Sequence, residues 1–67
     1  MSIQEVIFEK LKKIGQLKRK LSATDYLAIK YAEGEITISE YSETKEQRRQ
    51  WRAEINALET EIKRLKG

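Results

Sequence analysis

The chain has 67 residues, no Cys and no His, and it carries 14 Lys and Arg against 11 Asp and Glu, for a net charge of +3 at pH 7. This length allows one domain at most, over 1–67, and the missing Cys and His exclude disulfides, thiolate metal sites and imidazole chemistry. Hydrophobic residues at 39%, charged residues at 37% and no Pro are typical of amphipathic helices, so an all-α fold is expected. No signal peptide or bilayer-spanning run is visible, and we expect a soluble protein without cofactors or membrane contacts.

Charge is segregated along the chain. Residues 1–21 hold six Lys or Arg against two Glu, residues 22–44 hold five Asp or Glu against one Lys, and residues 45–67 hold seven Lys or Arg against four Glu. The three segments therefore carry net charges of +4, −4 and +3. We expect the acidic middle segment to neutralise part of the two basic ends.

The first predicted helix covers about residues 2–20. Ser2 with Glu5 three residues later resembles a capping box, and an apolar stripe follows at spacings of three and four residues. The members of this stripe are Ile3, Val6, Ile7, Leu11, Ile14, Leu17 and Leu21. Leu11, Ile14 and Leu17 are expected in the core seam.

A short second helix is predicted over about residues 23–33, with Ser22 or Thr24 as its N-cap. Gly34 then stands where a helix commonly ends in a left-handed residue. A helix this short is not stable by itself, so it should bridge the two longer helices and dock through its apolar side chains.

The third predicted helix covers residues 38–66. Thr37 and Glu40 match a capping box, and a seven-residue register follows in which apolar side chains predominate. Its seam consists of Tyr41, Thr44, Arg48, Trp51, Ile55, Leu58, Ile62 and Leu65. This helix would be about 43 Å long against about 28 Å for the first. Part of its seam should therefore remain for another subunit, in an oligomeric bundle of helical hairpins.

Arg48 interrupts the apolar seam and should receive an acidic partner. We expect Asp25 or Glu33 to pair with Arg48 or Arg52, while aromatic and apolar side chains of the middle segment (Tyr26, Ile29 and Tyr31) pack over Tyr41 and Trp51. The predicted docking motif thus comprises Asp25, Tyr26, Ile29, Tyr41, Arg48, Trp51 and Arg52.

Residue patterns for catalysis are nearly absent, because the acidic side chains have no accompanying base, nucleophile or phosphate-binding loop. The chain is therefore expected not to be an enzyme. Two basic clusters, one near each end and the second containing Trp51, leave nucleic-acid binding open as an alternative. Because Trp51 falls on the heptad seam, we expect it to pack in the core and not to stack on a base.

Residues 21–59 resemble a segment of small proteins from tailed bacteriophages and prophages. The similarity lies in S-A-T-D-Y-L-A-I-K-Y-A-E-G-E-I-T-I-S-E-Y and, further on, Q-R-R-Q-W-R-A-E-I-N-A-L-E. It looks like the C-terminal part of the PBSX-prophage XkdW-like proteins and, more loosely, of tail-fibre assembly proteins, whereas residues 1–20 form an added arm.

The resemblance implies a non-catalytic protein of a phage tail or late-gene region, in the bacterial host cytoplasm or the virion. Its partners would be a second copy of itself and another protein such as a tail component. A phage-encoded inhibitor of a host protein is the remaining alternative.

Overall fold

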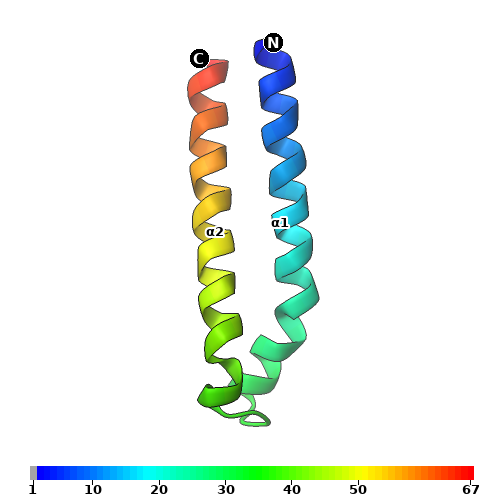
Figure 1. Ribbon diagram of the computed structural model, residues 1–67, viewed down its shortest axis with the longest axis vertical. Helices are drawn as coiled ribbons and strands as arrows, with labels where there is room; N and C mark the ends of the chain where they lie inside the picture. Colours follow the sequence, from blue (N-terminus) through cyan, green and yellow to red (C-terminus); the bar gives the residue numbers. More distant parts are fainter. Residues whose placement is uncertain (1) are drawn as a thin grey trace.

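A computed structural model describes residues 2–67 as a hairpin of two antiparallel α-helices (Figure 1). Helix α1 covers Ile3–Ala32 and helix α2 covers Ile38–Lys66, and the described residues contain no strand. The molecule is a rod of 48 × 16 × 15 Å with both termini at the same end. The predicted all-α helical hairpin is confirmed.

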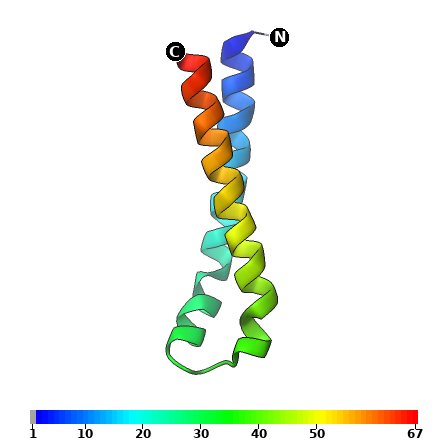
Figure 2. The same ribbon diagram turned by 90° about the vertical axis from the view of Figure 1, so that its left-hand side faces the viewer.

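The separate bridging helix is a wrong prediction, because residues 2–20 and 23–33 belong to one continuous helix, α1. No Gly or Pro stands between the two predicted segments, and Ser and Thr are tolerated inside a helix. Instead of capping a new helix, the Thr24 hydroxyl lies 3.1 Å from the carbonyl oxygens of Lys20 and Leu21. Such bonds to the preceding turn commonly bend a helix, and α1 changes direction in this region (Figure 2).

The continuity of α1 removes the predicted mismatch in helix length. Helix α1 has 30 residues and α2 has 29, so they pair along their whole course. We expected part of the α2 seam to lie uncovered for another subunit. That expectation is wrong, because α1 covers the seam. Any second copy has to bind a different surface.

The N-caps predicted at Ser2 and Thr37 are present. The Ser2 hydroxyl accepts a hydrogen bond from the Glu5 amide at 3.2 Å. At the start of α2, the Thr37 hydroxyl accepts from the Glu40 amide at 3.2 Å, and a Glu40 carboxylate oxygen accepts from the Thr37 amide at 3.1 Å. This complete capping box fixes where α2 begins after the turn.

The turn between the helices depends on Gly34, whose φ is +78°. The Gly34 amide donates to the Tyr31 carbonyl at 3.1 Å, and the Glu35 amide donates to the Lys30 carbonyl at 2.8 Å. This pair of bonds is the Schellman arrangement, which satisfies the last carbonyls of α1. The predicted role of Gly34 is confirmed, and the chain reverses between Ala32 and Ile38.

The core follows the predicted heptad of α2. Every second seam position is buried and the intervening ones are half-buried, which gives the four buried residues Tyr41, Arg48, Ile55 and Ile62. Leu58 and Leu65 are among the half-buried residues. From α1, Ile14 and Leu17 complete the apolar cluster with Ile55 and Ile62, as predicted.

Leu11 is the exception among the residues predicted for the seam, because its side chain remains 50% exposed. The seven-residue spacing from Ile14 and Leu17 leads back to Ile7 and Lys10, not to Leu11. Lys10 is half-buried at that position, where it forms an ion pair with Glu61 of α2. Leu11 consequently lies beside the seam, at the edge of the hairpin.

Candidate functional site

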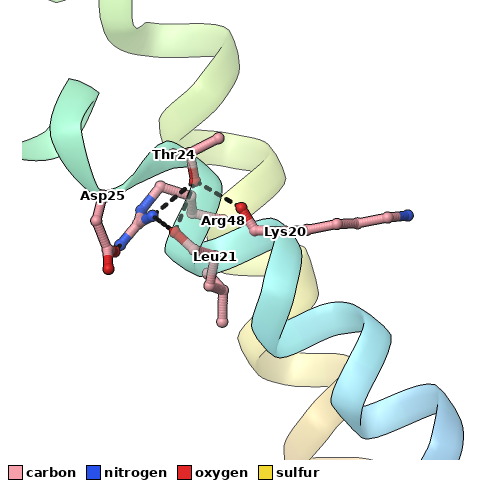
Figure 3. Close-up of polar contacts among 5 residues, drawn as sticks. All are labelled: Lys20, Leu21, Thr24, Asp25 and Arg48. Carbon is pink, nitrogen blue, oxygen red and sulfur yellow. Dashed lines mark hydrogen bonds and ion pairs between the residues drawn. The ribbon is translucent and has the colours of Figure 1, made fainter.

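Arg48 is the buried charge of the hairpin, and its guanidinium reaches across from α2 to α1 (Figure 3). Nη1 donates to the Leu21 carbonyl and to the Thr24 hydroxyl, both at 2.7 Å. Nη2 donates to the Asp25 carboxylate at 2.9 Å. Of the predicted pairings of Asp25 or Glu33 with Arg48 or Arg52, the structure shows that of Asp25 with Arg48. Two uncharged acceptors that the sequence did not reveal extend it.

The acceptors come from one turn of α1, at the place where this helix bends. Asp25 is 59% exposed on its side chain, so water screens its charge and the ion pair itself contributes little. The Leu21 carbonyl and the Thr24 hydroxyl lie in a less exposed part of the structure. They therefore carry more of the interaction that holds the guanidinium in the seam.

The aromatic part of the predicted motif is only partly assembled. Tyr31 stacks on the buried Tyr41, with ring centroids 4.9 Å apart and planes at 16°. This contact closes the seam near the turn, as predicted. Tyr26 and Ile29, however, are each 57% exposed, so the prediction that they pack over Tyr41 and Trp51 is wrong. In a continuous α1, these two positions face away from the seam.

Trp51 packs against the apolar core cluster and is half-buried, which agrees with its heptad position. The Lys20 ammonium lies 5.9 Å from the centre of its ring system, within the range of a cation–π contact. Arg52 is exposed, and within residues 2–67 the acidic partner of the motif bonds to Arg48 and not to Arg52. Arg48 is therefore the arginine that organises this part of the fold.

Two ion pairs join the helices along one edge of the rod. Lys10 pairs with Glu61, and Lys13 pairs with Glu54 at 3.2 Å. The hydrogen bond from Lys10, followed by its charge, lowers the pKa of Glu61 below its ordinary value. Within α2, the hydrogen bond from Arg49 lowers the pKa of Glu46 in the same way. The Lys10–Glu61 and Lys13–Glu54 pairs could not be inferred from the sequence, because they depend on the register of α1 against α2.

Large apolar side chains also lie outside the seam. On α1, Phe8 is 65% exposed, and Leu11, Tyr26 and Ile29 are each at least half exposed. Ile3 and Ile38 are the exposed isoleucines near the starts of the two helices. Scattered apolar side chains are ordinary on a protein surface, but several along one helix indicate a contact surface.

Among residues 2–67 no group of three or more acidic side chains is placed to hold a metal ion. Neither described helix is long and apolar enough to cross a membrane. The hollows on the rod are open and shallow; one of them lies between Leu11 and Ile62, with Lys18, Glu59 and Lys63 along its edges.

Comparisons of the chain with protein-family models, with curated proteins and with solved structures gave no match. The resemblance of residues 21–59 to phage and prophage proteins is therefore a prediction that rests on the sequence alone. These residues contain the turn and both partners of the Arg48–Asp25 pair, and along α2 they extend past Ile55 into the half that holds the termini.

Proposed function

We propose that the chain is a non-catalytic accessory protein of a phage or prophage, which acts by binding a second copy of itself and another protein. Assembly of the tail or of the tail fibres is the process that the sequence resemblance favours. The observation that carries this proposal is the exposure of large apolar side chains on a hairpin whose seam is already filled. Such surfaces are characteristic of protein interaction sites.

The turn half of the rod is the surface proposed for the other protein. It holds the acidic segment of residues 22–44, with a net charge of −4, and the exposed side chain of Ile38 beside the turn. A partner with basic residues around an apolar patch would complement it. This half also contains most of the segment that resembles phage proteins, which supports a specific docking role there.

A non-catalytic role is supported by the character of the titratable groups. The carboxylates whose pKa values are lowered, Glu46 and Glu61, belong to exposed ion pairs on the outside of the rod. Catalytic groups are expected in concave sites where burial or charge tunes their pKa. The Glu46–Arg49 and Lys10–Glu61 ion pairs are of the kind found on the surfaces of helices.

Nucleic-acid binding has less support. Trp51, the aromatic residue of the second basic cluster, packs on the core under Lys20 and is not free to stack on a base. Lys10 and Lys13 of the first cluster are engaged with Glu61 and Glu54. Fluorescence anisotropy with labelled DNA and RNA at low salt tests this alternative, and a steep loss of affinity with salt would favour it.

The proposal is tested by co-expressing the tagged chain with the product of each neighbouring gene. We expect one of these products to co-purify as a stoichiometric complex. The variant Glu35→Lys/Ile38→Ser should keep its helicity and lose that complex, because both side chains are exposed at the turn end. Failure of every neighbouring product to bind would contradict the proposal.

A further inference from the structure

A symmetric pattern runs along one flank of α1, outside the seam. The outer stripe, as we name it, consists of Phe8, Leu11, Gly15, Ser22, Tyr26 and Ile29. Its spacings are 3, 4, 7, 4 and 3, so the pattern reads the same in both directions from the midpoint between Lys18 and Arg19. The four large members lie at its two ends and are each at least half exposed.

We propose that two copies of the chain form a dimer in which the outer stripe of one α1 packs antiparallel on the outer stripe of the other. This proposal specifies the self-association included in the proposed function. A two-fold axis passes between Lys18 and Arg19, and the assembly is a bundle of four helices. Self-complementary contacts of this kind are what a two-fold interface requires.

The register follows from the symmetry. Residues that face each other have numbers that add to 37, so Phe8 lies opposite Ile29 of the second copy and Leu11 lies opposite its Tyr26. Each large apolar side chain at one end of the stripe therefore meets another large apolar side chain. The contact from Phe8 to Ile29 extends over about 32 Å of helix.

Small residues occupy the middle of the stripe. Gly15 lies opposite Ser22 of the second copy, and apart from the adjoining residues and backbone of α1 nothing lies within 4 Å of the place where a Gly15 Cβ would be. Small side chains at these two positions let the helices approach closely at the centre of the contact, and larger side chains fill the space towards its ends.

Charge favours the antiparallel orientation. The rod has a basic end, formed by residues 1–21 and 45–67, and an acidic end, formed by residues 22–44. Antiparallel packing places each acidic end beside a basic end, whereas parallel packing would place like charges together.

Lys18 and Arg19 are the unfavourable charges of this arrangement, because they lie next to the two-fold axis. Both side chains are exposed, and their long apolar stems let the charged ends extend into water beside the contact. The centre of the interface is therefore compatible with these two residues.

Sedimentation equilibrium of the purified chain tests the dimer without any other partner. We expect the mass of two chains at micromolar concentration. The variant Phe8→Ser/Ile29→Ser should raise the dissociation constant by at least about tenfold and should keep its helicity, because both side chains are exposed in the hairpin. Ile38→Ser is the matched control, since Ile38 is also exposed but lies outside the stripe, and it should remain dimeric.

Introduced cysteines test the orientation, because the chain has no Cys of its own. An equimolar mixture of the variants Gly15→Cys and Ser22→Cys should form a mixed disulfide in a glutathione buffer. Either variant alone should stay monomeric on a non-reducing gel, since residue 15 and its copy are separated by about 10 Å along the axis. Efficient linkage of Gly15→Cys to itself would show a parallel dimer and overturn the proposal.

A wild-type chain that stays monomeric, or that forms trimers or larger assemblies, would also overturn it. These outcomes are independent of the co-expression experiment. Phe8→Ser/Ile29→Ser tests the dimer, and Glu35→Lys/Ile38→Ser tests the surface proposed for the other protein. Loss of one interaction with retention of the other would show which of the two inferences fails.

Discussion

In the half of the hairpin that holds both termini, the seam consists of aliphatic side chains, among them Ile14, Leu17, Ile55 and Ile62. In the half that holds the turn, equivalent positions of α2 carry Tyr41, Thr44 and Arg48. Both halves keep the seven-residue spacing and both bury their seam. They differ in whether the contact is apolar or is directed by hydrogen bonds and ring stacking.

The difference separates two contributions to the fold. Burial of aliphatic groups supplies free energy but little direction, so the terminal half would tolerate small shifts of one helix along the other. The guanidinium of Arg48 has three acceptors on one turn of α1 and cannot follow such a shift without losing them. We infer that the terminal half provides most of the stability and the turn half provides the register.

The largest effect is expected from the variant Ile55→Ala. Removing this buried side chain should cost about 3 kcal/mol, because apolar contacts are lost and a cavity remains in the terminal half. The control Ile38→Ala, at an exposed position, should change stability by less than about 0.5 kcal/mol. Urea titrations followed by circular dichroism measure both, and equal losses would contradict the assignment of the core.

A smaller effect is expected from Arg48→Ala, which removes three hydrogen bonds to α1. We expect a loss of about 2 kcal/mol, since a buried charged donor is removed from two half-buried acceptors. Asp25→Ala should cost less than about 1 kcal/mol because its carboxylate is largely in water. If the Asp25 variant lost as much stability as the Arg48 variant, the ion pair and not the uncharged acceptors would be the main interaction.

The glycines should respond with opposite signs to the same substitution. Gly34→Ala should destabilise the hairpin by about 1 kcal/mol, because residue 34 adopts a φ of +78° in the turn. Gly15→Ala should stabilise α1 by up to about 1 kcal/mol, since a Cβ there meets no other atom. Thermal unfolding in the Phe8→Ser/Ile29→Ser background measures both without a contribution from self-association.

The smallest effect concerns pH and the Lys10–Glu61 pair. Because this contact lowers the pKa of Glu61 below its ordinary value of 4.5, the stabilisation is complete above that value and is lost as the pH falls through the lowered pKa. Lys10→Met should return the pKa of Glu61 towards 4.5, as measured by NMR titration. An unchanged pKa would show that the two side chains do not interact in solution.

Much of this fold could be predicted from the sequence because its signals are local. The capping box at Thr37, the left-handed Gly34 and the heptad of α2 each depend on residues within a few positions of one another. The pairing of Arg48 with Asp25 was also predicted, since a charge in an apolar seam requires a partner.

Two features could not be predicted. Ser22 and Thr24 are good N-caps and also acceptable helix interiors, and the Thr24 hydroxyl bonds to carbonyl oxygens of the preceding turn, so the two segments join and Tyr26 and Ile29 face outwards. Separately, the register of α1 against α2 places Lys10, not Leu11, in the seam. These positions are decided by the tertiary register, which no local pattern contains.

The turn at Gly34 has a mechanical consequence because it brings both chain ends to the same end of the rod (Figure 1). A force that pulls the ends apart loads one layer of the seam at a time, so the hairpin opens like a zipper and not by sliding. The aliphatic layers would separate first, and the Arg48 contacts and the Tyr31–Tyr41 stack would separate last. An attachment through the termini would therefore yield at low force, because only one layer of the seam resists at a time.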